Sequence, residues 1–189
     1  MVRTSFSHPI RIAELAVGTQ GGAIGITFAP GKFQEVALTG SWARDIETDL
    51  AAIREWGADY VITLIEPWEF EELRIQSLPE RVAAHELVWH GLPIVDGAAP
   101  DARLLDEWRT LGSFLSRELL AGKRVVVHCK GGLGRAGTVA SMLLLDTGTA
   151  QDGDEAMGMT RQVRPGAIET PAQESFVRGW PTFIQNYGK

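Results

Sequence analysis

The sequence predicts an α/β fold in which a central, mostly parallel β-sheet is flanked by helices. Short apolar runs rich in β-branched residues occupy residues 60–65, 86–90 and 124–128, and such runs are typical of strands buried on both faces of a parallel sheet. A long helical pattern at residues 101–120 separates the last two runs. A strand, helix and strand in this order indicate a parallel crossover unit.

Length and composition favour one domain. The chain has 189 residues, of which 44% are hydrophobic and 22% charged, as in an ordinary globular protein. We expect a single domain over residues 1–189, with an N-terminal extended segment at residues 1–28 and a functional core at residues 29–189.

The charge and the cysteine content exclude several classes of function. A net charge of −6 argues against a nucleic-acid partner or an anionic membrane surface. No apolar run approaches the roughly 18 residues of a membrane span, and no secretory signal is visible. One cysteine can form neither an internal disulfide nor the paired-cysteine arrangement of a structural zinc site. We therefore expect a cytoplasmic protein without a metal or a cofactor.

The first half of the chain opens with a hairpin. Extended segments at residues 11–15 and 23–28 flank a glycine-rich turn. Apolar residues at helical spacing then predict an amphipathic helix over residues 45–56, and Gly57 is its stop signal. The acidic run at residues 66–72 is interpreted as a solvated face, the usual role of a short charge run.

The second half is mostly helical. A loop at residues 91–100, punctuated by proline and glycine, leads into the long helix. Three more helical stretches follow the last strand, at residues 136–145, 153–163 and 171–185. The last is expected to be bent or broken at Pro181.

Residues 128–135 contain a candidate nucleophilic thiol and a candidate anion-binding loop. Cys129 lies at the end of a predicted strand and just before a predicted helix. An ordinary thiol has a pKa of about 8.5 and is mostly neutral at pH 7, but loop N–H groups and a helix N-terminus favour an anion. The same N–H groups and helix N-terminus also attract a phosphate dianion.

The residues after the cysteine complete an anion site. Gly131, Gly132 and Gly134 can adopt positive φ and turn successive N–H groups toward one centre. Arg135 adds a planar fork that can hold two phosphoryl oxygens. A lone cysteine is more often an inert buried residue. The joint occurrence of strand, His-Cys, glycines, arginine and helix start favours a nucleophile.

This stretch resembles the signature of the protein tyrosine and dual-specificity phosphatases, in which five residues separate a cysteine from an arginine. Residues 89–97 resemble their general-acid loop, and residues 164–173 resemble a later segment of the same group. With residues 40–45, the similarity is closest to the cyclin-dependent-kinase-associated phosphatases and their bacterial relatives, and it spans about residues 28–180.

The resemblance implies a role for each site residue. Cys129 would be the nucleophile that forms a phosphocysteine, Arg135 would bind phosphate, and Asp96 would be the general acid. Asp101 is the rival acid, but a residue that precedes a helical pattern is more simply an N-cap. The backbone that forms the phosphate cradle would come from Lys130, Gly131, Gly132, Leu133 and Gly134.

Three auxiliary roles follow from the same resemblance. His128 would orient the loop, and Gln173 would help to place the attacking water. Family members commonly have Ser or Thr after the signature arginine, where this chain has Ala136. That hydroxyl is credited with easing departure of the thiolate, so we expect slow hydrolysis of the phosphoenzyme unless Thr138 or Gln173 compensates.

We therefore expect a cysteine-dependent phosphatase domain that hydrolyses phosphate monoesters. The phosphorylated residue would be phosphotyrosine and/or phosphoserine and phosphothreonine. The catalytic core would be residues 29–189. Its substrate would be a phosphorylated protein or a small phosphate ester, and the sequence names no protein partner. One alternative is an arsenate reductase or sulfurtransferase, since these enzymes also use a cysteine in an anion-binding loop. Another is a non-catalytic module that reads phosphate without turnover.

Overall fold

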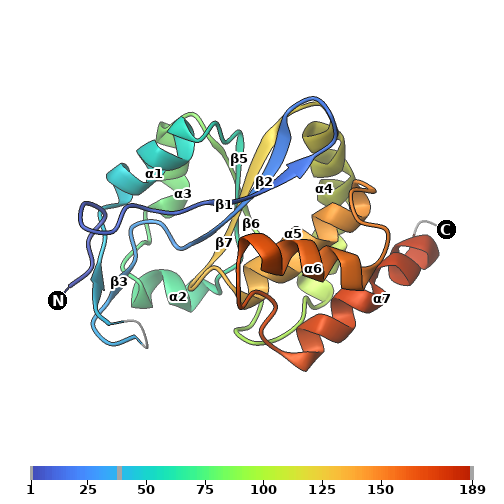
Figure 1. The fold of residues 1–189 in the computed structure, drawn as a ribbon. Helices are drawn as coiled ribbons and strands as arrows, with labels where there is room; N and C mark the ends of the chain where they lie inside the picture. The colour runs from blue at the N-terminus through green and yellow to red at the C-terminus, as the bar shows by residue number, and fades with distance from the viewer. Residues whose placement is uncertain (1, 38–39, 188–189) are drawn as a thin grey trace.

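A five-stranded sheet forms the centre of the computed structural model, which describes residues 2–37 and 40–187 (Figure 1). The strand order is β1-β2-β7-β5-β6, in which β1 is antiparallel to β2 and every other neighbouring pair is parallel. A second, two-stranded sheet pairs β3 with β4. The strands are β1 (Ala13–Val17), β2 (Gly22–Phe28), β3 (Phe33–Gln34), β4 (Trp42–Ala43), β5 (Tyr60–Thr63), β6 (Val88–Gly91) and β7 (Arg124–Cys129).

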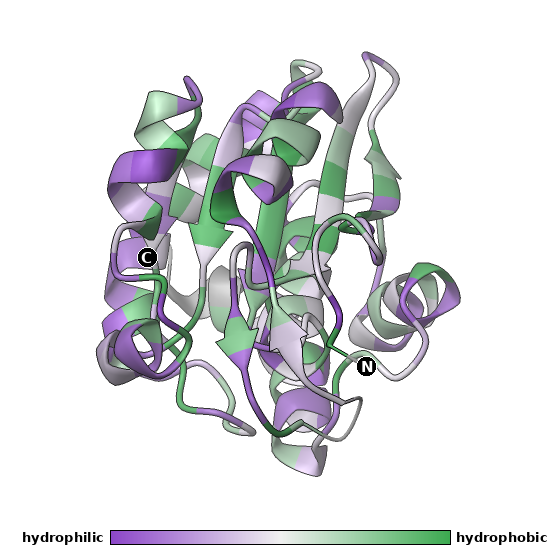
Figure 2. Ribbon diagram, turned by 90° about the vertical axis from the view of Figure 1, so that its left-hand side faces the viewer, coloured by the Kyte–Doolittle hydropathy of each residue, from purple (hydrophilic) through white to green (hydrophobic). Residues whose placement is uncertain are grey.

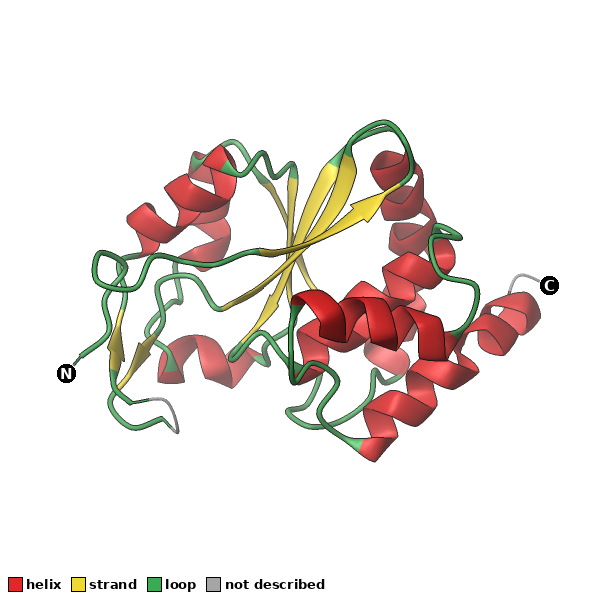
Figure 3. Ribbon diagram, in the orientation of Figure 1, coloured by secondary structure: helices red, strands yellow, loops and turns green. Residues whose placement is uncertain are grey.

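Helices cover both faces of the main sheet. Figure 3 shows α1 and α3 on one side and α4 to α7 on the other. The helices are α1 (Ile46–Glu55), α2 (Pro67–Glu72), α3 (Leu78–Ala84), α4 (Ala102–Leu120), α5 (Gly134–Asp146), α6 (Gly153–Val163) and α7 (Pro171–Tyr187). The predicted fold class is confirmed.

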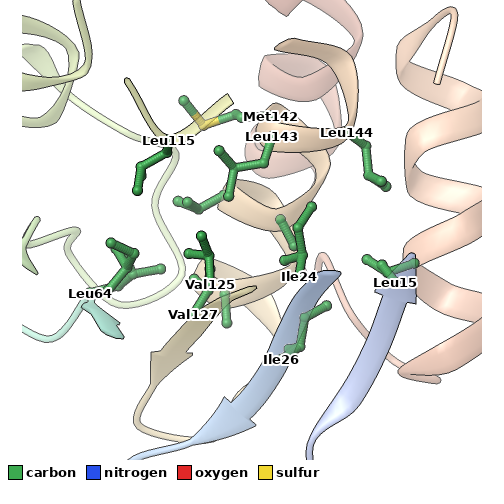
Figure 4. Packing of buried hydrophobic residues seen from close by; sticks show 14 of the residues in the cluster. Leu15, Ile24, Ile26, Leu64, Leu115, Val125, Val127, Met142, Leu143 and Leu144 are labelled. Atoms are coloured by element: carbon green, nitrogen blue, oxygen red, sulfur yellow. The ribbon is translucent and has the colours of Figure 1, made fainter. Parts of the chain in front are cut away.

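The two faces of the sheet bury different side chains because successive strand residues point to opposite sides. Val125 and Val127 pack toward α4 and α5, against residues such as Leu115 and Leu143 (Figure 4). Val126 packs on the other face, with side chains of α1 and α3. Figure 2 shows the result as hydrophobic strands enclosed by helices that carry hydrophilic residues.

Several sequence predictions are confirmed with shifted bounds. The N-terminal hairpin exists, but β1 begins at Ala13 rather than at residue 11. The predicted crossover from β6 through α4 to β7 is parallel, yet β5 lies between the two strands. Short apolar runs identify buried strands without saying which of them are neighbours, so the strand order could not be predicted.

Other predictions were wrong or missed an element. The acidic run at residues 66–72 is solvated only in part, because Pro67–Glu72 forms α2, which exposes Glu71 and Glu72 but buries Glu69. The expected break at Pro181 is absent, since α7 continues through it as one helix. The short elements α2, α3, β3 and β4 were not predicted, because each is too brief to show a period. None of the helices described is long and apolar enough to cross a membrane.

Candidate active site

The loop between β7 and α5 contains the signature residues. β7 ends at Cys129 and α5 begins at Gly134, so the chain turns from strand to helix within four residues. The Cys129 side chain is 3% exposed, and the Gly132 N–H donates to its Sγ at 3.2 Å. The thiol therefore faces the loop's own backbone at the carboxyl end of the sheet, where α/β folds gather their sites.

Glycine is required at one position of this loop by conformation. Gly132 has φ of +69°, and a Cβ there would lie 2.4 Å from the backbone of Thr27. Of the three loop glycines, each of which can adopt positive φ, only Gly132 does so. The N–H of Gly134, expected in the phosphate cradle, instead donates to Glu169 Oε2 at 2.8 Å.

Arg164 holds the outside of the loop. Its Nε donates to the Gly132 carbonyl at 2.9 Å, and its Nη2 donates to the Gly131 carbonyl at 3.1 Å. The C=O and N–H of a trans peptide point in opposite directions, and the described residues contain no cis peptide. Fixing these two carbonyls outward therefore turns the N–H groups of Gly132 and Leu133 inward.

Arg135 is buried beside the loop and is only 1% exposed. Its Nη1 and Nη2 donate to the two carboxylate oxygens of Glu69 at 2.6 and 3.0 Å, and Nη1 also donates to the Ile94 carbonyl at 3.1 Å. Nε is buried without a hydrogen-bond partner among the residues that the structure describes. Such an unpaired donor is costly, and it is therefore available to an oxygen that enters the loop.

The carboxylates around Arg135 keep it charged. Burial alone would lower the pKa of this guanidinium, but the hydrogen bonds and charge of Glu69, together with Cys129 and Asp96, raise it above its usual value. α2 places Glu69 for this contact, because a capping box ties Glu69 Oε2 to the Glu66 N–H at 2.8 Å. This ion pair with Arg135 is why Glu69 is buried although its neighbours Glu71 and Glu72 are exposed.

Asp96 is a second carboxylate that contacts the same guanidinium. Its Oδ1 lies 3.1 Å from Arg135 Nη2, although the Asp96 side chain is 69% exposed. Two residues at the start of α7 anchor the following backbone: Thr170 Oγ1 donates to the Gly97 carbonyl at 2.9 Å, and Gln173 Nε2 donates to the Ala98 carbonyl at 3.2 Å. The loop is fixed, while the carboxylate at its tip is accessible.

Asp101, the rival acid, caps α4, and its side chain accepts from the Arg103 N–H at 3.0 Å.

His128 is fully buried behind the thiol. Burial is the main reason that its pKa falls to about 4, so the ring is neutral at pH 7. Thr63 Oγ1 accepts from the Trp89 indole at 2.9 Å and lies 2.7 Å from His128 Nε2. The hydroxyl can then donate to Nε2, which leaves the ring proton on Nδ1, 3.4 Å from the Cys129 carbonyl. This chain orients the backbone at the nucleophile.

The remaining auxiliary residues lie in less direct positions. Gln173 is buried, and its Oε1 accepts from the backbone N–H of Glu169 at 2.9 Å. Thr138 uses its hydroxyl within α5, donating to the Gly134 carbonyl at 2.8 Å. Ala136 is buried in the first turn of the same helix. Neither Thr138 nor Ala136 brings a hydroxyl to Cys129.

Comparison with known proteins agrees with this geometry. The family model described as "Swiss Army Knife protein, DSP-PTPase phosphatase domain" (PTP-SAK) matches residues 36–177. This chain belongs to that family of dual-specificity phosphatase domains. The match includes the signature loop, the loop of Asp96, α2 and the start of α7.

Individual relatives place the chain among the protein tyrosine phosphatases in the wide sense. The rat cyclin-dependent kinase inhibitor 3 is 30% identical over 156 residues, which cover 82% of this phosphatase and 69% of the relative. Its human counterpart is 26% identical over 177 residues, covering 89% and 77% of the two chains. Mouse protein tyrosine phosphatase type IVA 2 is 35% identical over 91 residues, which cover 48% of this chain and 51% of the relative.

Solved structures show the same fold. The crystal structure of kinase associated phosphatase superposes with a TM-score of 0.80 at 24% identity and covers 94% of this chain and 97% of its own. The active form of Tk-PTP gives a TM-score of 0.64 at 24% identity, covering 88% and 97%. The predicted phosphatase fold and the enzyme class are confirmed.

Sequence reasoning missed several residues that contact the loop or its arginine, among them Glu69, Arg164 and Glu169. Glu69 stood inside a run interpreted as solvated, although Pro67 at the helix start and the Glu66–Glu69 spacing of a capping box were visible signals. Arg164 and Glu169 fall in the segment that resembles the family, but nothing local to that segment says which loop it meets.

Proposed function

We propose that this phosphatase hydrolyses phosphate monoesters through a phosphocysteine on Cys129. The observation that carries the proposal is the buried position of the Cys129 thiol, which accepts from the Gly132 N–H and lies in the loop just before Arg135, whose buried Nε has no partner among the described residues. A nucleophile, donors for the phosphoryl oxygens and a nearby acid are the groups that this reaction needs.

In the first step the phosphate dianion enters the loop and takes the place of Asp96 on the Arg135 fork. The thiolate of Cys129 attacks phosphorus, so that an S–P bond forms while the ester P–O bond breaks. Asp96 gives its proton to the departing oxygen, and the alcohol or phenol leaves neutral.

In the second step a water molecule attacks the phosphorus of the phosphocysteine. The P–O bond forms as the S–P bond breaks, the thiolate is restored, and Asp96 takes the proton of the water. Arg135 and the loop N–H groups hold the phosphoryl oxygens in both steps. Gln173 supports the acid loop through Ala98, so its role here is to position that loop.

The proposed substrates are proteins phosphorylated on tyrosine and/or on serine and threonine. The catalytic unit would be the single domain at residues 1–189. Residues 1–28 supply β1 and β2, and β2 pairs with β7 up to Cys129, so the core at residues 29–189 depends on them.

A direct test measures turnover of an aryl phosphate, a panel of phosphopeptides and a panel of phosphoinositides, with acid quenching to trap a phosphoenzyme. We expect hydrolysis of the aryl phosphate and of phosphopeptides. We also expect acid quenching to trap an acid-stable phosphoenzyme in which the phosphate is bound to Cys129. Binding of phosphopeptides without any turnover would instead identify a phosphate-reading module. Turnover without a cysteine-linked phosphate would reject the intermediate.

Asp96→Ala should separate esters by their leaving groups. Esters with poor leaving groups should lose about 10²–10⁴-fold in kcat/KM, the usual contribution of a general acid. An activated aryl ester needs little protonation and should lose far less in kcat/KM, which reports formation of the phosphoenzyme and not its hydrolysis. The matched control is Asp101→Ala, which removes the helix cap and should leave the leaving-group dependence unchanged. Equal losses on both kinds of ester would remove Asp96 from the role of acid.

A further inference from the structure

A buried lysine, Lys32, lies against the phosphate loop and contacts a different carbonyl from those that Arg164 binds. Lys32 follows β2, whose last residue Phe28 pairs with Cys129, so the chain leaves the sheet beside the loop. The preceding Gly31 has φ of +73°, and its N–H donates to Asp49 Oδ2 at 2.9 Å. The Lys32 carbonyl accepts from the Arg44 N–H at 3.2 Å. The backbone of Lys32 is therefore fixed from both sides.

The ammonium of Lys32 is enclosed by aromatic rings rather than by acids. The residue is 5% exposed, and Nζ lies 5.1 Å from the ring centre of Phe28 and 4.8 Å from that of Trp42. Its hydrogen bond is to the Lys130 carbonyl at 3.2 Å. A buried lysine normally pairs with a carboxylate, but the nearby Asp49 already holds Arg44 through both oxygens, at 2.7 and 2.8 Å.

The charges that face Lys32 come from four segments. Arg44, Lys130 and Arg164 are cations that disfavour its charge, and Cys129 is the one group that favours it electrostatically. Arg3 and His8 also lie against the Trp42 ring. Burial is the largest effect and lowers the pKa of Lys32 to about 8, with the charge on Cys129 opposing it.

The contact with Lys130 also fixes the geometry of the loop. Because the peptide between Lys130 and Gly131 is trans, a carbonyl held toward Lys32 turns the Gly131 N–H toward the centre of the loop. Arg164 does the same for the next two peptides. Three consecutive N–H groups are thus turned inward. Arg164 holds the carbonyls of two of these peptides, and Lys32 holds the other together with the Ala29 N–H, which donates to the same carbonyl at 3.5 Å.

We propose that Lys32 is a positioning residue of this active site, which holds the Lys130–Gly131 peptide with its N–H inward and stabilises the negative charge of the Cys129 thiolate. The inference rests on the proposed function, because it deepens the description of that same site. Lys32 can stabilise the thiolate and hold the peptide in this way only while its ammonium is charged. This stabilisation is therefore present below about pH 8 and is lost as Lys32 deprotonates above that pH.

The first experiment compares Lys32→Met and Lys32→Arg with wild type in kcat/KM for an aryl phosphate between pH 5 and 10. Lys32→Met should lose roughly tenfold or more at pH 7, as for removal of a charged hydrogen bond, and should lack the fall that wild type shows above about pH 8. Competitive inhibition by inorganic phosphate should weaken in parallel, and Lys32→Arg should restore part of both. Lys123→Met, which removes an exposed lysine paired with Asp59, is the matched control.

A second measurement needs no activity and no folded Lys32 variant. Coupling between two charges is reciprocal, so removal of the thiolate in Cys129→Ala should lower the pKa of the Lys32 ammonium, followed by NMR of labelled lysine.

The outcomes separate this inference from the proposed function. A Lys32→Met protein that folds and keeps the wild-type pH profile and phosphate inhibition would overturn it, as would a Lys32 titration that Cys129→Ala leaves unchanged. Wild type without any turnover would reject the proposed function, while the NMR titration would still decide the coupling.

Discussion

Cys129→Ser should abolish turnover of an aryl phosphate, with kcat reduced on the order of a thousandfold or more. A serine hydroxyl is neutral at pH 7, and it would lie in the same loop, 3% exposed, with no base among its hydrogen-bond partners to activate it. Burst measurements should show no phosphoenzyme. Steady-state rates and acid-quench labelling check this result.

The serine variant should still bind phosphate, because the N–H groups and Arg135 remain. Inorganic phosphate titrated into Cys129→Ser should therefore protect it against thermal unfolding. Arg135→Lys is the contrasting variant, since it keeps the thiol but loses the fork, and it should be protected much less. A Cys129→Ser protein that retains even a tenth of wild-type turnover would show that the reaction does not pass through this thiol.

Among the variants proposed here, Glu69→Ala should lower the free energy of unfolding most. The Arg135 guanidinium would remain buried, with Ile94 O and the accessible Asp96 as its remaining partners. Removing one partner of a buried ion pair typically costs about 3–5 kcal/mol of the free energy of unfolding. Denaturant unfolding monitored by circular dichroism measures the loss, and kcat/KM should fall as well because Arg135 is no longer held at the loop.

Glu71→Ala is the control for that experiment. Glu71 is exposed on the same short helix, so its removal should change the free energy of unfolding by no more than about 0.5 kcal/mol. If Glu69→Ala were as mild as Glu71→Ala, the pair with Arg135 would contribute little, and α2 would be fixed by its apolar contacts instead.

Local sequence was sufficient for the part of the site that is contiguous. Residues 128–135 carry the thiol, the turn and the arginine in register, and strand and helix signals flank them, so the loop could be predicted without a structure. The long helix and the buried strands were also visible, because their periods extend over enough residues. The roles of Cys129, Arg135 and Asp96 remain proposals.

What could not be predicted depends on contacts between distant segments. Glu69 meets Arg135 across 66 positions of sequence, and Lys32 meets Lys130 across 98. These contacts depend on the strand order and on the packing position of α2. The local spacing of hydrophobic residues, which predicts helices and strands, gives neither the strand order nor that position. The charge of Glu69 led to the wrong prediction of an exposed side chain, because an acidic residue is usually solvated unless the fold supplies a buried cation.

The anchoring of the loop carbonyls has a consequence for folding. The loop lies between β7 and α5, yet its peptides are oriented by a turn before β3 and by the segment after α6. Contacts of such high sequence separation tend to form late. A nascent chain that ends at α5 would contain the whole signature but not Arg164, so it would lack the hydrogen bonds that turn two of the N–H groups inward. Competence to bind phosphate is thereby coupled to completion of the fold.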